Sequence, residues 1–299
     1  MNVKWENIFA TWSTGPSKSE QERCDNTIRA VRTAIGKSEK LSTKSLKVFI
    51  QGSYRNNVNV TQSSDVDVGV ICNDIFYAEY PEGKTREDYG NMVGGYNISE
   101  FRVDLFNAMQ AHFPQNSVEL GSKAISVNSN SYRVDADVVP LVEFRRYWDT
   151  GAYRAGVVLF DTKKNVRIQN YPEILFPYWP QTPLHYENGV SKNARCSRRF
   201  KGVVRILKNL SVAMTNDGYT SADNVPSYLL ECITYNCPDS IFSLSTWSER
   251  VVSVLDFVEA NAGDQWTEVD EIKYLFHSSQ PWKLGDVKEF IRDVRSCLG

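Results

Sequence analysis

The sequence has few histidines and lacks the paired cysteines that usually bind zinc. It contains three histidines, and its six cysteines include no C-x-x-C pair, so no zinc-ligand spacing is present. The cysteines are therefore expected to be free thiols that serve in packing, as in proteins of a reducing cytosol. No G-x-x-x-x-G-K-[ST] loop occurs either, which disfavours a P-loop NTPase.

The sequence also lacks the features of a membrane or secreted protein. No run of about eighteen apolar residues occurs, and the start, MNVKWENIFA, has neither the basic flank nor the apolar centre of a signal peptide. With 34 basic and 36 acidic side chains, the chain has no broad cationic surface for nucleic acid. We expect a cytoplasmic protein with no membrane partner and no strong nucleic-acid binding.

Apolar patterning predicts a mixed α/β region in the first part of the chain. Ser19 and Glu22 form a capping box at the start of an amphipathic segment, and Gly36 ends it. The other expected elements are strands at 45–53 and 64–72, an exposed loop at 73–97, a helix at 98–113 and a hairpin from 123 to 144.

The second part of the chain shows helical patterns. Residues 170–193 alternate prolines with aromatic side chains and are interpreted as the crossing between two lobes. Helices are expected from about 195 to 214, after Pro226, after a Thr246/Glu249 capping box and at the end of the chain. The sequence thus predicts a mixed α/β lobe over residues 1–169 and an α-helical lobe over residues 170–299.

Residues 51–70, QGSYRNNVNVTQSSDVDVGV, combine a strand pattern with two carboxylates. Asp65 and Asp67 project to one face of the strand, about 7 Å apart. Two like charges this close repel each other unless a cation lies between them. The simpler alternative is a strand with a wet polar face, but Gly52-Ser53 ends the preceding strand and the later segment YRVDADVV adds Asp137.

Three carboxylates and a phosphate-holding turn are the components of a two-magnesium site. Magnesium prefers hard oxygen ligands and keeps positions open for phosphate and water. Glycine lets the backbone approach a phosphate, and neighbouring N–H and hydroxyl groups can donate to it. Two such ions stabilise an in-line displacement at phosphorus.

Several segments resemble one family throughout: GSYRNNVNV, SDVDVGV, DADVVPLVEF, IQNYP, HYENGVSKN and VPSYLLECITYN. They resemble the bacterial cGAS/DncV-like nucleotidyltransferases (CD-NTases) of anti-phage CBASS systems, a branch of the polymerase-β-like superfamily. The resemblance implies an enzyme that joins nucleoside triphosphates, ATP and UTP among them, into a cyclic di- or oligonucleotide with release of pyrophosphate. It also implies two Mg²⁺ ions, for which Mn²⁺ can substitute, and a downstream effector that responds to the product.

The same resemblance implies roles for individual residues. Asp65 and Asp67 would ligate both ions, and Asp137 the ion that activates the acceptor hydroxyl. Asp135 points to the same face, so the choice between Asp135 and Asp137 stays open. The nucleotide-binding residues would be Gln51, Gly52, Ser53, Asn170, Lys201, Arg205, Lys208, Ser227 and Tyr228.

Basic residues of the helical lobe recur at helical spacing. Arg198, Lys201, Arg205 and Lys208 are expected along one helix face, either as phosphate contacts or as an ordinary solvated face. Lys208 resembles the family's triphosphate-contacting lysine.

Two adjacent residues follow Pro226 at the expected start of a helix. Ser227 would lie at the helix N-terminus, a natural anion site. Tyr228 resembles the aromatic residue that stacks on the donor base in the family, and the alternative is an ordinary buried tyrosine.

Asn170 bears on the choice of base. It resembles the asparagine of family members that accept pyrimidines, the CdnE-like clade, and an amide can pair with the carbonyl and N3–H of uracil. The alternative is an asparagine that forms a turn before Tyr171-Pro172.

Two other functions remain open at the level of sequence. The same metal site could adenylylate a small molecule, a protein or an RNA end, or the chain could be a catalytically inactive nucleotide sensor or scaffold. The resemblance also makes the terminal Gly299 a candidate attachment point for a conjugation partner, since some CBASS systems attach the nucleotidyltransferase through its last residue.

Overall fold

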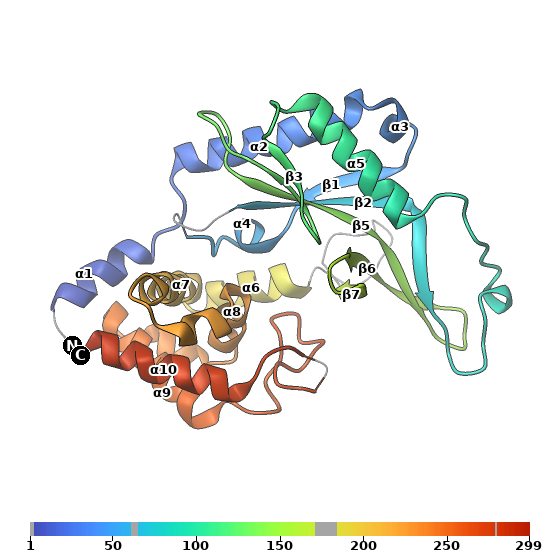
Figure 1. The fold of residues 1–299 in the computed structure, drawn as a ribbon. Helices are drawn as coiled ribbons and strands as arrows, with labels where there is room; N and C mark the ends of the chain where they lie inside the picture. The colour runs from blue at the N-terminus through green and yellow to red at the C-terminus, as the bar shows by residue number, and fades with distance from the viewer. Residues whose placement is uncertain (1–2, 61–64, 171–183, 279) are drawn as a thin grey trace. The chain divides into compact units, whose positions relative to one another are not determined.

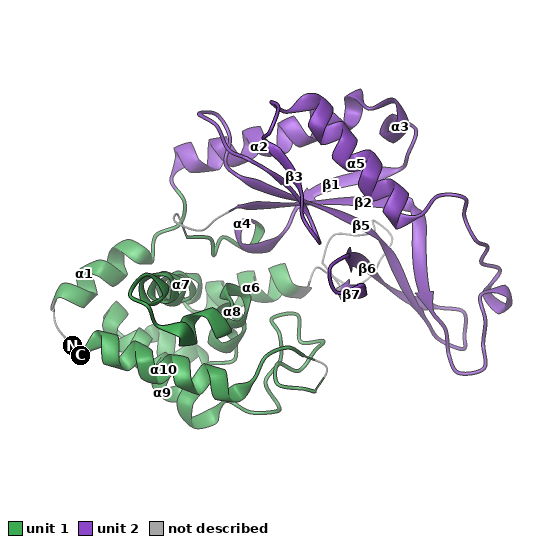
Figure 2. Cartoon of the chain, viewed as in Figure 1, with its two compact units in different colours: residues 1–16, 55–64, 180–299 green, residues 17–54, 65–179 purple. Residues whose placement is uncertain are grey.

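The computed structural model describes residues 3–60, 65–170, 184–278 and 280–299 (Figure 1). The chain forms two compact units, and each is made of segments that are distant in sequence (Figure 2). Unit 1 contains residues 1–16, 55–64 and 180–299, and unit 2 contains residues 17–54 and 65–179. Two segments that precede residue 170 therefore belong to the same unit as the C-terminal helices.

Unit 2 is built on a mixed β-sheet. Its central strands, β2 (Val66–Glu79) and β5 (Ala136–Tyr147), are parallel, and every other pairing is antiparallel. The order β1-β2-β5-β4-β3 is extended at β5 by β6 and then β7. The remaining strands are β1 (Leu46–Ile50), β3 (Val118–Leu120), β4 (Ile125–Val127), β6 (Tyr153–Asp161) and β7 (Val166–Asn170). The expected mixed α/β fold and the hairpin of β4 and β5 are confirmed.

Helices α2 (Lys18–Lys37) and α5 (Ile98–His112) lie side by side over one face of this sheet (Figure 1). A capping box of Asn97 and Glu100 starts α5, and its apolar stripe is buried. Helix α2 is capped by Ser17, whose hydroxyl accepts from the N–H of Glu20, so the predicted Ser19 cap is wrong by two residues. Gly36 lies within the helix. Short helices α3 (Glu39–Ser42) and η1 (Glu87–Tyr89) complete the unit.

The predicted loop at 73–97 is too long at its start. Strand β2 continues to Glu79, because its pairing with β5 resumes at Phe76 after a register shift. Asn73 and Asp74, which are exposed at that irregularity, interrupt the apolar pattern and so suggested a loop. The guanidinium of Arg145 lies over the ring of Phe76, with 4.0 Å to the ring centroid, and stabilises the extended strand.

Unit 1 is α-helical. Helix α7 (Phe200–Asn216) carries eleven buried residues and packs against α1, α6, α8, α9 and α10. A helix that is buried on most sides is expected at the centre of an all-α core. The surrounding elements are α1 (Val3–Trp12), α6 (Leu184–Arg195), α8 (Ser227–Tyr235), α9 (Trp247–Asn261), α10 (Leu284–Leu298), η2 (Thr220–Asn224) and η3 (Asp239–Ser243). Helix α4 (Gly52–Asn56) has residues in both units.

The helix predicted from about 195 to 214 begins later, as α7 at Phe200, and Arg195 is the last residue of α6. Ser197 and Arg198 have φ values of 51° and 63°, a left-handed conformation that ends α6 before α7 begins. The side chain of Asn193 then accepts from the N–H of Lys201 in the first turn of α7. Arg198 consequently lies outside the row of basic residues on α7.

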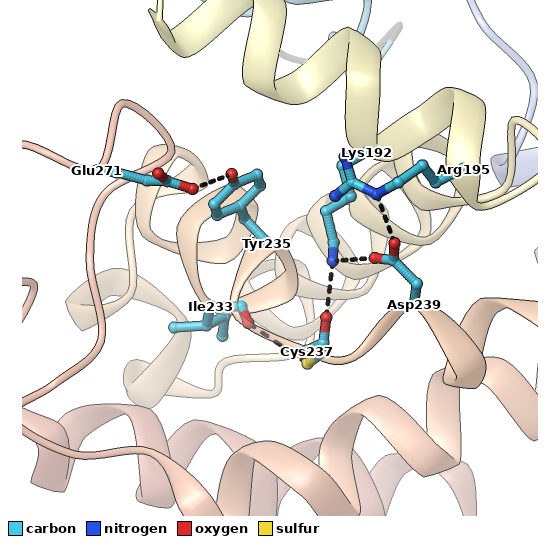
Figure 3. Close-up of polar contacts among 7 residues, drawn as sticks. All are labelled: Lys192, Arg195, Ile233, Tyr235, Cys237, Asp239 and Glu271. Atoms are coloured by element: carbon cyan, nitrogen blue, oxygen red, sulfur yellow. Dashed lines mark hydrogen bonds and ion pairs between the residues drawn. The ribbon is translucent and has the colours of Figure 1, made fainter.

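An ion-pair cluster of Lys192, Arg195 and the partly exposed Asp239 joins α6 to the segment after α8 and to η3 (Figure 3). Asp239 accepts from Lys192 Nζ at 2.8 Å and from Arg195 Nε at 2.7 Å. Lys192 Nζ is buried and also donates to the carbonyl of Cys237 at 2.7 Å. Although partial burial opposes ionisation, the hydrogen bonds and charges of Lys192 and Arg195 lower the pKa of Asp239 to about 2.

The six cysteines are free thiols, and five of them are buried, as expected for packing residues. Within the described residues, no helix combines the length and the apolar character that crossing a bilayer requires.

We expect Asp239→Asn to destabilise the fold in a pH-dependent way. The folded-state pKa lies below the ordinary value of 3.8, so the carboxylate stabilises the protein above pH 4 and this contribution is lost as the pH falls toward 2. Because the group is partly solvated, the loss at pH 7 should be about 1 to 2 kcal/mol in the free energy of unfolding. Urea unfolding from pH 8 to pH 3 measures it.

A matched control is Asp256→Asn, which alters the exposed pair of Asp256 with Arg295 on the surface of the same unit. It should change the free energy of unfolding by about 0.5 kcal/mol or less. Equal losses for both variants, or a loss for Asp239→Asn that does not vary with pH, would refute the stabilising role assigned to Asp239.

Candidate active site

Four carboxylates gather on one face of the sheet where β2 and β5 begin. Asp67 of β2 is directly beside Asp137 of β5 in the parallel register, and Val66 is beside Ala136. Since side chains alternate along each strand and neighbouring strands lie about 4.8 Å apart, the two aspartates share one face. Val66 and Ala136 are buried on the other face, so packing on that side fixes the carboxylates' direction.

The carboxylates on this face repel one another when no cation is bound. Asp65 precedes β2 and is exposed. Partial desolvation, and then the negative charges of Asp137 and Asp135, raise the pKa of the Asp65 carboxyl above its ordinary value. A bound cation would relieve this repulsion.

Asp135 and Asp137 differ in their hydrogen bonds. Asp135 Oδ1 accepts from the backbone N–H of Ser129 at 2.5 Å and so closes the turn between β4 and β5. Asp137 Oδ1 accepts from the hydroxyl of Ser126, its neighbour on β4, at 2.8 Å. These contacts draw both carboxylates toward protein donors. Among the described residues, no three His, Cys, Asp or Glu side chains are placed to hold a metal ion without rearrangement.

The Gly52 turn lies against Asp67. Gly52 has a φ of 67°, and a Cβ atom added there would collide with Oδ2 of Asp67. The N–H of Gln51 donates to the carbonyl of Asp67 at 2.9 Å. Ser53 follows as a half-buried residue of α4, and Tyr54 anchors that helix by donating to Glu20 of α2 at 3.1 Å. The residues of the predicted turn and strand are therefore adjacent in space.

The basic row of α7 is buried rather than solvated. Lys201, Arg205 and Lys208 are 7%, 8% and 3% exposed. Arg205 donates to the backbone carbonyls of Ser13 and Asn57, and burial lowers its pKa to about 10. This guanidinium ties three segments of unit 1 together, so we assign Arg205 to the fold and leave it out of the nucleotide contacts.

Glu231 and His185 are additional candidates that motif reasoning missed. Glu231 is 2% exposed on α8 and lies 3.2 Å from His185 Nε2. Burial opposes ionisation of Glu231, but His185 and then Lys208 and Lys201 lower its pKa. The two lysines are thus held near an ionised carboxylate. An acidic residue within an apolar helix pattern was the only signal in the sequence.

Ser227 and Tyr228 open helix α8. Ser227 is exposed as the first residue, and Tyr228 is half-buried. The hydroxyl of Tyr228 donates to Glu268 at 2.8 Å. His185 and Trp282 contact its ring at tilted angles, with centroids 5.6 Å and 5.7 Å away. Glu268 follows Tyr228 by forty residues, and no sequence motif connects them.

Asn170 is the last residue of β7, and its backbone is opposite Val157 of β6. Its side chain and residues 171–183 lie outside the described residues. The predicted pairing with uracil and most of the predicted crossing between lobes fall in this part of the chain.

The chain is similar to known proteins over nearly its whole length. Residues 187–299 match the family model for the cGAS/DncV-like nucleotidyltransferase C-terminal helical domain. The cyclic dipyrimidine nucleotide synthase CdnE of Cecembia lonarensis is 38% identical over 96% of this chain and 95% of its own. The enzyme of the same name from Legionella pneumophila is 37% identical over 100% of this chain and 99% of its own.

Among solved structures, the Rhodothermus marinus CdnE c-UMP-AMP synthase with Apcpp and Upnpp is similar, with a TM-score of 0.81 and 25% identity. The match covers 98% of this chain and 96% of that one. The whole-length identity, the helical-domain match and the paired aspartates of β2 and β5 agree, and the chain belongs to the cGAS/DncV-like nucleotidyltransferases.

Proposed function

We propose that the protein is a metal-dependent cyclic dinucleotide synthase that uses UTP as one substrate. The observation that carries the proposal is the placement of Asp67 beside Asp137, with the backbone of Gly52 against Asp67. The product would contain uridine and would signal to an effector in anti-phage defence.

The donor set is suited to hard divalent cations. Asp65, Asp67 and Asp137 would hold two Mg²⁺ ions, or Mn²⁺ in their place, since carboxylate oxygens are the ligands that these ions prefer. When bound, the ions would neutralise phosphate charge and acidify the acceptor ribose hydroxyl. Asp137 would exchange its bond from Ser126 for a cation, whereas Asp135 would keep its structural bond to Ser129.

The turn after β1 would hold phosphate. Gly52 has no side chain at the point of closest approach to Asp67, so a phosphate oxygen can lie near the backbone. Ser53 supplies a hydroxyl donor, and Gln51 is held by its bond to the carbonyl of Asp67. These residues would orient the α-phosphorus toward the attacking hydroxyl, and positioning of this kind is a large part of catalysis in phosphoryl transfer.

In unit 1, Lys208 and Lys201 would bind the triphosphate, Ser227 would donate to it, and Tyr228 would stack on a base. The support is the cationic pair on α7, the exposed hydroxyl at the start of α8, and a half-buried aromatic ring next to that hydroxyl. A buried ammonium group attracts a phosphate more strongly than an exposed one does, because little water screens the two charges.

The choice of base rests on relatives and on one residue. The relatives at 38% and 37% identity are named cyclic dipyrimidine synthases, and the Rhodothermus structure is named a c-UMP-AMP synthase. Asn170 would pair with uracil through its amide.

The reaction would proceed in two attacks. A ribose hydroxyl attacks the α-phosphorus of the second nucleotide, and pyrophosphate leaves. The linear intermediate then turns, and its free ribose hydroxyl attacks the α-phosphorus of its own remaining triphosphate, so that a second pyrophosphate leaves and the ring closes. Adenylylation of another acceptor and a purely sensory role are not favoured, since relatives that match nearly the whole chain are cyclic nucleotide synthases.

Product analysis tests this proposal directly. We expect incubation with the four triphosphates and Mg²⁺ to yield pyrophosphate and a phosphatase-resistant product whose mass includes at least one uridylate. Mass spectrometry and labelling of one triphosphate at a time identify the bases. A purine-only product would remove the UTP assignment, and a phosphatase-sensitive product would remove ring closure.

Asp67→Asn should abolish turnover. It removes one ligand charge, so pyrophosphate release should fall by about a thousandfold or more. Thermal stability should be kept or slightly raised, because the change also removes like-charge repulsion. The control is Asp74→Asn on the same strand, which removes an exposed charge far along β2 and should keep full activity. Turnover at the wild-type rate in Asp67→Asn would overturn the metal assignment.

Gly52→Ala should lower activity more than Gly83→Ala, which changes a glycine of similar backbone conformation. Gly83 also has a positive φ, at 75°, but a Cβ there meets nothing within 4 Å. Both changes should cost about 1 to 2 kcal/mol of stability through backbone strain. Only Gly52→Ala should also lower kcat/KM, by about a hundredfold, because the new methyl group displaces Asp67. Equal activity of the two variants would show that the contact of Gly52 with Asp67 has no catalytic importance.

A further inference from the structure

Two tyrosines tie helix α8 to the segment 267–271. The hydroxyl of Tyr228 donates to Glu268 Oε2 at 2.8 Å, and the hydroxyl of Tyr235 donates to Glu271 Oε1 at 2.6 Å. The second of these bonds is drawn in Figure 3. The tyrosines are seven residues apart, about two helical turns, so they project from the same side of α8. The chain therefore contains two hydrogen bonds of one kind between the same two segments.

The segment that carries Glu268 is held on both sides. Asn236, just beyond α8, donates to the carbonyl of Thr267 at 2.8 Å and accepts from its N–H at 3.2 Å. Asn188 of α6 donates to the carbonyl of Val269 at 2.8 Å. Both neighbours of Glu268 are thus fixed to helices of unit 1. The carboxylate has a defined position before it meets Tyr228.

The two pairs differ in their surroundings. Glu268 is 7% exposed, and Gln280 donates to its other oxygen at 2.7 Å, whereas Glu271 is exposed. A hydrogen bond to a carboxylate is stronger and more directional when little water competes for it. The Glu268 bond should therefore restrain its tyrosine, and the Glu271 bond should contribute little.

The hydroxyl bond restrains the direction of the Tyr228 ring. The oxygen lies on the ring axis, so fixing it fixes where the ring points. His185 and Trp282, at tilted contacts, limit rotation of the ring plane. The ring is held at three points, although it is only half-buried.

We propose that Glu268 is a positioning residue, which fixes the ring of Tyr228 in the orientation that stacks on a nucleotide base. The inference rests on the proposed function, which gives Tyr228 its contact with the base. Preorganising an aromatic ring lowers the entropy cost of binding, because the ring need not be immobilised by the ligand.

The test compares Tyr228→Phe with Tyr235→Phe, which removes the same kind of hydrogen bond from the same helix. Affinity for a non-hydrolysable triphosphate is measured by calorimetry, and kcat and KM are measured by pyrophosphate release. Tyr228→Phe should raise Kd and KM about five- to tenfold, the worth of one such hydrogen bond, with kcat changed less than twofold. Tyr235→Phe should leave all three constants within a factor of two.

Glu268 variants complete the cycle. Glu268→Ala should reproduce the loss of nucleotide affinity seen in Tyr228→Phe, whereas Glu268→Gln should largely keep that affinity because it retains an acceptor. The double variant Tyr228→Phe/Glu268→Ala should bind nucleotide no more weakly than either single variant. Affinity for inorganic tripolyphosphate, which has no base, should not change in any of them. Thermal melting of each variant verifies that binding is measured on folded protein.

Three results would overturn the inference: unchanged nucleotide affinity in Tyr228→Phe, equal losses in Tyr235→Phe, or a parallel loss of tripolyphosphate binding. Calorimetry requires no turnover, so a wild type that binds nucleotide without making a cyclic product refutes the proposed function and leaves the tyrosine test readable.

Discussion

The parallel pairing of β2 with β5 is the constraint on which the candidate site depends. A parallel register places residues side by side on the same face, so Asp67 and Asp137, seventy positions apart, become neighbours. The valines that alternate with the aspartates are buried on the opposite face. A slip of one residue in either strand would turn a carboxylate into the core. The hydrophobic core of unit 2 therefore maintains the like-charge repulsion that a cation can relieve.

Unit 1 buries charged side chains within its core. Its central helix carries two lysines and an arginine inside the unit, and each has a defined electrostatic environment. Arg205 is satisfied by backbone carbonyls, whereas Lys201 and Lys208 act on the buried carboxylate of Glu231. Buried basic groups beside a carboxylate suit a site for a polyanion, because little water screens their attraction for its charge. The same helix row thus separates into one structural and two candidate functional residues.

Two asparagines in the segments that resemble the family hold the backbone of another segment. Asn188 and Asn236, which belong to HYENGVSKN and VPSYLLECITYN, fix the backbone on either side of Glu268. Such segments identify a family correctly but do not say whether a given residue binds a ligand or holds another residue. Hydrogen-bond partners distinguish these roles, and those partners are distant in sequence. The prediction of helix boundaries from sequence was limited for a related reason. The left-handed turn at Ser197 and Arg198 contains no glycine or proline that would indicate the end of a helix.

The sequence by itself determined the alternation of valine and aspartate, the Gly52-Ser53 turn, the capping box of Thr246 and Glu249, and the family. Each of these depends on residues close together in the chain, where spacing alone sets the side-chain direction. Only the tertiary structure decided which strand lies beside β2, that the α7 cations are buried, and that Tyr228 is held by Glu268. Those facts depend on contacts between distant segments, because burial and hydrogen bonding are properties of the packed chain and not of any local pattern.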